Sequence, residues 1–313
     1  MTLAILLGSS LGLLVLPAGL GRVGRRMAPQ EWARLVIWSL ATGAVALELA
    51  LILVGLPTVA RSVGVPQLAS ACERMAGGLA PGGPVVGWFA AGSATLVLGF
   101  AARAALRARR SRRGLRIEST LGEHRDHNSY ELVVLPTERV IAVSVPGNPG
   151  QIVVSDGLVR SLSPEAFEVV LRHEEAHLAW RHGRYLVAAS MVESSLGIVP
   201  LVRRSAAILR LAVERWADED AAMSVGSRTQ VHEALIGVGN AMIGPVDLAA
   251  FSAEATLSQR LDALACAPRV PTRFTRSMVY AVTFGLGLGG AVGLGTWFGQ
   301  AHMMLSMAGL CRF

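Results

Sequence analysis

The chain has 313 residues, of which 52% are hydrophobic and only 16% are charged. A mean hydropathy of +0.48 is too high for an ordinary soluble protein and is typical of an integral membrane protein. The formal net charge of +7 comes from arginines clustered beside apolar segments, which favours a membrane-topology signal over direct binding of nucleic acid. The three cysteines have neither metal-site nor disulfide-framework spacing.

Three apolar segments near the N-terminus are each predicted to cross a bilayer as a helix. They cover residues 3–20, 35–56 and about 84–102, and about 20 helical residues suffice to cross the hydrocarbon core. A cleaved signal peptide is the alternative for the first segment. Its arginines follow the apolar run instead of preceding it, which favours a retained helix with its N-terminus outside. A fourth predicted span covers residues 278–298.

The distribution of arginine predicts how these spans are oriented. Residues 21–34 contain four arginines and residues 103–116 contain seven, whereas residues 57–83 contain two. Cytoplasmic loops retain positive charge near membrane ends, so we expect a multi-pass protein of a bacterial cell membrane with both termini outside. Cys72 and Cys311 then both lie outside, where they either pair or remain free thiols.

Residues 117–272 differ from the rest in their mixed charge and frequent turn signals. Segments 131–135, 140–145 and 151–155 are rich in β-branched residues and are separated by turn sequences, which predicts three short strands. The preceding polar segment with His124 and His127 is interpreted as a loop. Ser163 and Pro164 form a helix-start signal, and the apolar period after them predicts a helix through His177.

That predicted helix contains the pentapeptide HEEAH at residues 173–177. A spacing of four places His173 and His177 on one helix face, which is suitable for two ligands of one metal ion. Glu174 can then activate a water on that metal without ligating it. A catalytic zinc takes three protein ligands, and Glu214 is the predicted third. Asp218, one turn later, is predicted to accept the other N–H of a ligating histidine.

Two further features complete this predicted site. His182 is a candidate for orienting the site or for contacting a substrate carbonyl in the transition state, with a helix cap as the alternative. An extended substrate is expected to add to the strand at about 139–145 or 151–155.

Residues 185–202 are apolar enough to cross a membrane. A single crossing would separate Glu214 from the histidines, so we predict that this segment lies at the membrane surface or packs inside the bundle. Glu193 should face protein or water, and a turn near Pro200 should return the chain to the site.

Four stretches of the sequence together resemble the membrane gluzincins: VVSDGL at 153–158, RHEEAH at 172–177, ExxxD at 214–218 and SQRLDAL at 258–264. The chain is most similar to antibiotic-sensor peptidases of the BlaR/MecR type, and more distantly to HtpX and CAAX-type proteases. Because only a short segment follows residue 298, we expect it to lack the large extracellular domain of the sensors. The resemblance implies a Zn²⁺ metalloendopeptidase that acts on the cytoplasmic side.

The resemblance also implies a partner, a cytosolic repressor of the BlaI/MecI kind whose cleavage serves regulatory signalling. Quality control of membrane proteins, as by HtpX, is the alternative. A non-catalytic membrane sensor with a structural zinc is the alternative from another class, but Glu174 argues against it because a structural site has no use for a base.

The predicted fold class is therefore a mainly α membrane protein with four transmembrane helices and an α+β zincin-like metallopeptidase domain between the third and fourth. Residues 1–116 form three transmembrane helices and a basic cytoplasmic linker. Residues 117–272 form the metallopeptidase domain, and residues 273–313 form the fourth transmembrane helix and a short extracellular tail.

Overall fold

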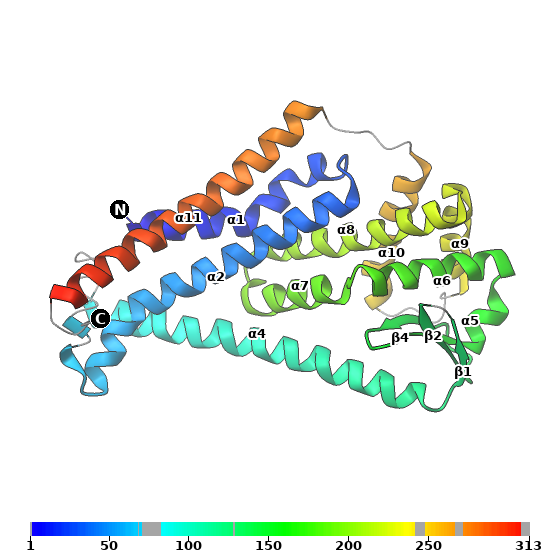
Figure 1. Cartoon of the computed structure of the whole chain (residues 1–313), viewed down its shortest axis with the longest axis horizontal. Coiled ribbons are helices and arrows are strands. Elements are labelled where there is room, and N and C mark those ends of the chain that lie inside the picture. The colour runs from blue at the N-terminus through cyan, green and yellow to red at the C-terminus, as the bar shows by residue number, and fades with distance from the viewer. Residues whose placement is uncertain are drawn as a thin grey trace.

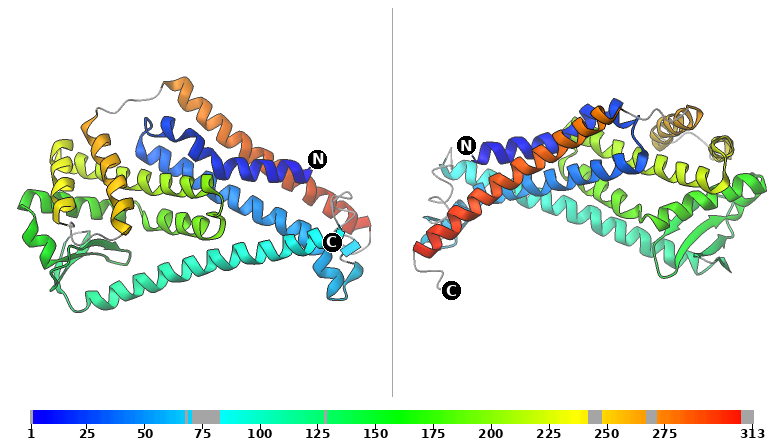
Figure 2. Two further views of the ribbon diagram at one scale, coloured as in Figure 1. Left: turned by 180° about the vertical axis from the view of Figure 1, so that it is seen from behind. Right: turned by 45° about the horizontal axis from the view of Figure 1, so that its top comes forward.

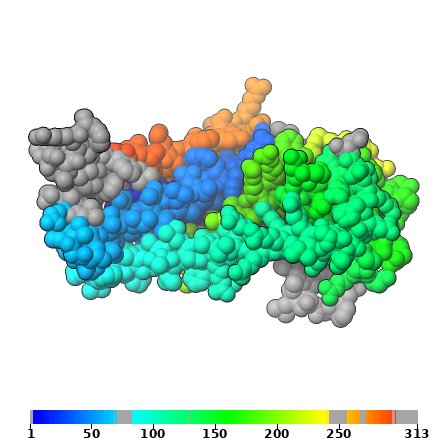
Figure 3. All heavy atoms as spheres, turned by 60° about the horizontal axis from the view of Figure 1, so that its bottom comes forward, coloured from blue at the N-terminus to red at the C-terminus, as the bar shows by residue number. Residues whose placement is uncertain are grey.

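The computed structural model describes residues 2–67, 69–70, 83–127, 129–241, 248–266 and 272–307. The molecule is elongated (Figure 3), with long helices at one end and a small sheet at the other (Figure 1). The long helices are α1 (Thr2–Gly24), α2 (Pro29–Ser62), α4 (Gly83–Ser119) and α11 (Arg273–Met307). Cys72 and Cys311 lie outside the described residues.

Among the described residues, three helices are long and apolar enough to cross a membrane, namely α1, α2 and α4. They contain the first three predicted spans and fit insertion into a membrane. The fourth predicted span lies within α11, which packs along α1 and also contacts α2 (Figure 2). Whether α11 crosses the membrane stays a prediction.

The arginine-rich segment that was expected to be a linker is helical, because α4 continues without a break to Ser119. Its basic half is docked onto the rest of the protein. The Arg112 guanidinium donates to the carbonyl of Gly183 at 2.8 Å, and that of Arg116 donates to the carbonyl of Pro146 at 2.6 Å. α4 thus connects the apolar helices to the sheet as one continuous helix (Figure 1).

The sheet has the strand order β1-β2-β4-β3. Its strands are β1 (Glu123–Asp126), β2 (Tyr130–Leu135), β3 (Ala142–Val145) and β4 (Gly150–Ser155). β2 and β4 pair in parallel, and the other two pairs are antiparallel. The three predicted strands are confirmed as β2, β3 and β4. The prediction of a loop at His124 was wrong, because this residue lies in β1. The sequence did not indicate this strand, since every residue of β1 is exposed and no apolar alternation marks it.

The segment after the sheet is helical. It consists of α5 (Asp156–Ser161), α6 (Pro164–Ala179), α7 (Gly183–Leu196), α8 (Pro200–Val225), α9 (Arg228–Ala241) and α10 (Leu248–Ala265). The predicted start of α6 is confirmed, since the Ser163 hydroxyl accepts from the backbone N–H of Ala166 and Pro164 occupies the first turn. Val170 and Leu171 of α6 pack on Ile152 of β4, which fixes the helix against the sheet.

α7 and α8 form a helical hairpin that packs against α1, α2 and α4. One core cluster joins Val36 of α2, Val192 of α7 and Leu209 of α8. Val97 of α4 packs against the same cluster and lies within the third predicted span. The hairpin therefore reaches among the apolar helices and turns back at Pro200, as predicted for a segment packed inside the bundle.

Within the hairpin, the Glu193 carboxylate of α7 pairs with the Arg210 guanidinium of α8. The Arg210 guanidinium thus compensates the charge of Glu193, and both side chains are partly exposed. This agrees with the prediction that Glu193 faces protein or water. The reversal between α7 and α8 is what brings the second half of α8 back to α6.

Candidate metal centre

α6 and α8 cross in contact with each other and bring three predicted metal ligands together. The Nε2 atoms of His173 and His177 are 3.1 Å apart. Glu214 of α8 places Oε2 at 3.4 Å from His173 Nε2 and Oε1 at 3.7 Å from His177 Nε2. One ligand atom from each residue lies within 4.8 Å of the others. The structure thus brings Glu214 next to His173, although the two residues are 41 positions apart in the sequence.

The donor set fits a divalent transition metal. Two imidazole nitrogens and one carboxylate oxygen are a typical protein ligand set of catalytic zinc. Zinc–nitrogen bonds of about 2.0–2.1 Å in a tetrahedral site place two ligand nitrogens roughly 3.3 Å apart, close to the spacing of the two Nε2 atoms. The three side chains are 9–24% exposed, which leaves room for a further ligand.

The electrostatics of the cluster favour a positive charge among the three side chains. Burial opposes charge on His173, but its hydrogen bonds to Asp218 and Glu214 outweigh burial and raise its pKa to about 10. Burial and the nearby charge of His173 lower the pKa of His177 to about 4. Burial acts against ionisation of Glu214, yet its hydrogen bond with His173 holds the pKa of Glu214 well below its usual range. A metal cation would replace the His173 proton, since a ligating imidazole nitrogen is unprotonated.

Asp218 contacts His173 at Nδ1, and Arg260 in turn holds Asp218. Asp218 Oδ1 lies 3.0 Å from His173 Nδ1, and the side chain is only 2% exposed. The Arg260 guanidinium of α10 donates to both Asp218 oxygens, at 2.8 and 2.6 Å. Its Nη1 also lies 3.3 Å from Glu214 Oε2. Burial raises the pKa of Asp218, but the hydrogen bonds from Arg260 and His173 prevail and lower it.

The sequence predicted no role for Arg260, although this residue lies in the SQRLDAL stretch that resembles the membrane gluzincins. One signal was present, since this arginine is the only basic residue in α10. Its partner Asp218 is 42 residues away in sequence, so the pairing depends on how α10 packs against α8.

His182 lies behind His177. Its Nδ1 is 3.0 Å from His177 Nδ1, and the residue is fully buried. His182 therefore contacts His177 at the ring atom other than the Nε2 that lies in the cluster, and its orienting role stays a prediction. Burial and the nearby His177 lower the pKa of His182 to about 3, so its ring is neutral.

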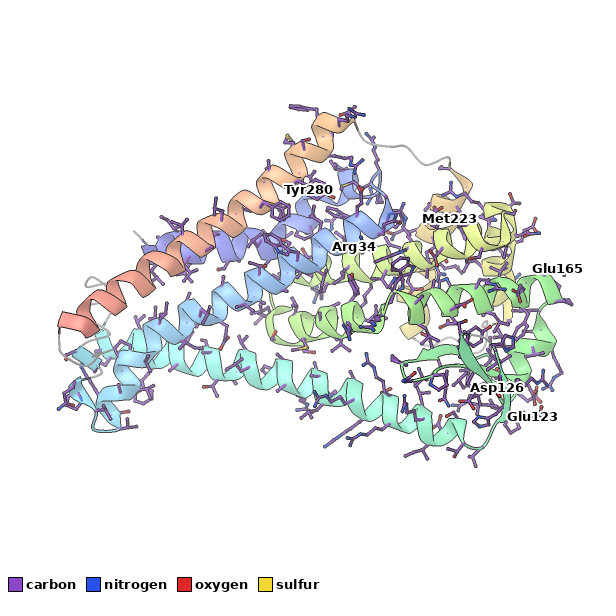
Figure 4. The ribbon with its side chains drawn as sticks, viewed as in Figure 1. Arg34, Glu123, Asp126, Glu165, Met223 and Tyr280 are labelled. Atoms are coloured by element: carbon purple, nitrogen blue, oxygen red, sulfur yellow. The ribbon has the colours of Figure 1, made fainter. Side chains whose placement is uncertain are left out.

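An aromatic cluster connects this histidine to α2. The ring of Trp216 lies 4.7 Å from that of His182 and 5.3 Å from that of Trp180, centroid to centroid. The Arg34 guanidinium of α2 lies over the Trp216 ring at 5.1 Å, and Figure 4 labels Arg34 at its place beside α8. A cation over an indole face is a favourable contact. The candidate metal centre is therefore linked to α2 through His182 and Trp216.

Glu174 lies beside the ligands and next to an edge strand. Burial raises the pKa of its carboxyl, while hydrogen bonds from the side chain and backbone of Ser144 act in the opposite direction. Ser144 belongs to β3, which pairs only with β4 among the described strands. The candidate base thus lies between the ligand pair and the free edge of the sheet.

Comparison with known proteins gives one family. No curated protein and no solved structure matches the chain. A family model described as Peptidase family M48 matches residues 107–238, which include the HEEAH segment and Glu214 but not Arg260. The match carries no support for the antibiotic-sensor type in particular. The chain therefore carries, over residues 107–238, a domain that matches Peptidase family M48, a family of zinc metallopeptidases.

Proposed function

We propose that this protein is an integral membrane zinc metalloendopeptidase in which His173, His177 and Glu214 hold the metal. The observation that carries the proposal is the convergence of these three side chains within 4.8 Å, inside the segment that matches a peptidase family. Asp218 and His182 act through the two histidines, because each lies on the Nδ1 atom of one ligand ring and so orients its Nε2 toward the metal.

Zinc held by these residues would supply a Lewis acid that acidifies a water molecule and polarises the scissile carbonyl. Glu174 takes the proton of that water and passes it to the leaving amine, a role that suits a buried carboxyl with a raised pKa. Asp218 accepts the Nδ1 proton of His173, and Arg260 keeps Asp218 ionised and fixed in position. The neutral ring of His182 holds the orientation of His177.

The substrate is a protein or peptide that binds as an added strand along β3. Of the two candidate strands in the sequence, β4 is paired on both sides, by β2 and β3. β3 has its second side free among the described strands, and Ser144 at its centre contacts Glu174. An extended chain on this edge would have its backbone paired by hydrogen bonds next to the ligands.

For the cellular role we infer cleavage on the cytoplasmic side of a bacterial membrane, because the arginine-rich end of α4 leads directly to the sheet. Cleavage of a repressor-like protein in regulatory signalling is our working hypothesis. Quality control of membrane proteins is the competing one. A non-catalytic sensor is disfavoured by the placement of Glu174 beside the ligands.

A pair of neighbouring substitutions tests the enzymatic proposal. Glu174→Gln removes the proposed base. Glu175→Gln is the matched control, because the Glu175 carboxylate contacts Arg172 and Ser129. Cells that express the wild type should contain protein fragments that are absent from cells with Glu174→Gln. The same fragments should be present in cells with Glu175→Gln. Their identity, repressor or membrane protein, decides between the two roles. Fragments that persist with Glu174→Gln would refute the proposal.

A further inference from the structure

A cavity of about 950 Å³ lies beside α8, where α1 ends and where α2 and α11 begin. The loop between α1 and α2, residues 25–28, forms one side, and α8 forms another. The start of α11 and part of α10 complete the lining. Figure 4 labels Met223, a lining residue of α8. The volume lies within the usual range for sites that bind small molecules.

The lining of this cavity carries an excess of positive charge. Its arginines are Arg25, Arg26, Arg204, Arg215, Arg228 and Arg276, and its carboxylates are Glu31, Glu219 and Asp262. Two arginines are already paired, Arg276 with Glu31 at 2.6 Å and Arg228 with Glu219 at 2.5 Å.

The other four arginines have no carboxylate within ion-pair distance in the part of the chain that the structure describes. Arg215 is the most constrained of them, because its Nε is buried and lacks a hydrogen-bond acceptor. Besides burial, the carboxylates of Glu219 and Asp218 attract its charge, and the positive charges of Arg228 and Arg25 repel it. A buried donor without an acceptor is unfavourable, and an anion in the cavity would add negative charge beside the arginines that line it.

We propose that this cavity binds the phosphate of an anionic phospholipid headgroup. Guanidinium groups bind phosphate oxygens through paired, charge-assisted hydrogen bonds. The position favours a lipid over a soluble compound, because α1 and α2 are candidate membrane spans and the cavity lies at the arginine-bearing loop between them. Basic pockets of this kind at the cytoplasmic ends of membrane helices bind anionic headgroups.

The site is separate from the metal centre but lies on the same helix. Arg215 directly follows Glu214, so a headgroup held by Arg215 contacts the helix that supplies the acidic ligand. The proposal rests on membrane insertion and does not require that the protein hydrolyse peptides.

The test measures lipid retention by the purified full-length protein in a neutral detergent, using native mass spectrometry. Phosphatidylglycerol and phosphatidylcholine are added at equal concentration. We expect the wild type to retain one phosphatidylglycerol and to prefer it over phosphatidylcholine. Arg25→Gln combined with Arg204→Gln should weaken this retention by about tenfold or more, since two charge-assisted contacts are lost.

Two controls separate the cavity from general surface charge. Arg109→Gln combined with Arg110→Gln removes two exposed charges of α4 outside the cavity and should leave retention unchanged. Ala207→Phe fills the cavity from α8 with every arginine intact and should reduce retention. Metal content of each variant reports that it is folded.

Three results would each overturn the assignment. They are equal retention of both lipids by the wild type, equal loss in the two double variants, and unchanged retention after Ala207→Phe. A fourth arm adds glycerol 3-phosphate or inorganic phosphate to the protein with bound phosphatidylglycerol. Displacement by either compound would place the natural ligand in solution and contradict the lipid assignment.

Discussion

Replacement of Asp218 by asparagine should weaken metal binding without removing a ligand. Asp218 Oδ1 lies 3.0 Å from His173 Nδ1 and the side chain is 2% exposed, so the contact is a buried, charge-assisted hydrogen bond. Such a bond contributes about 1.5–3 kcal/mol. Since 1.4 kcal/mol corresponds to about a factor of ten, we expect zinc affinity to fall about 10- to 100-fold, the usual effect of losing a ligand's outer partner.

The same substitution also releases Arg260. Its guanidinium would then interact mainly with Glu214, whose Oε2 is already 3.3 Å away, and would compete with the metal for that carboxylate. This second effect acts in the same direction as the first, so asparagine should weaken binding even though its side-chain oxygen can still accept from His173.

The assay is metal content after equilibration with a graded series of zinc chelators. Asp220→Asn is the matched control, because residue 220 lies two positions further along α8, about 200° around the helix from Asp218. Equal zinc affinity for Asp218→Asn and the wild type would refute the reasoning. So would an equal loss with Asp220→Asn, because the effect would then not depend on contact with His173.

Three further predictions concern the base, pH and topology. Glu174→Gln should keep its zinc and lose turnover by about 10²- to 10⁴-fold, with Glu175→Gln near wild type. Assays of the purified enzymes on the intact protein from which a cellular fragment derives can check this. The pKa of His173 is raised from 6.5 to about 10, so its proton stabilises the metal-free protein fully below pH 6.5 and this stabilisation is lost as pH rises toward 10. Thermal unfolding of chelator-treated protein should show that loss, and a flat profile would contradict it. Single cysteines at the exposed positions Arg184 and Arg203, without the native cysteines, should both resist an impermeant reagent in intact cells, whereas exterior labelling at 203 alone would break the shared site.

Much of the site could be predicted from the sequence because its signals are local. The two histidines of α6 share a face through helical spacing alone, and the Ser163 cap and Pro164 define where that helix begins. Long apolar runs mark α1, α2 and α4 by composition. The position of residues 185–202 also followed, because Glu214 has to return to the histidines.

The remaining features depend on contacts between segments far apart in the chain. Nothing within residues 140–155 distinguishes β3 as the free edge from β4 as an interior strand, because strand order is a property of the whole sheet. β1 escaped prediction since an exposed edge strand carries no apolar pattern.

The sequence by itself thus determined the metal-ligand pattern, the candidate base and the apolar helices, all of which follow from periodicity and composition. Only the tertiary structure decided what surrounds the ligands. Arg260 reaches Asp218 from α10, and His182 packs against the Nδ1 atom of His177. The arginine-lined cavity exists because the α1–α2 loop, α8 and α11 meet. These placements are set by long-range packing, which no local pattern of residues encodes.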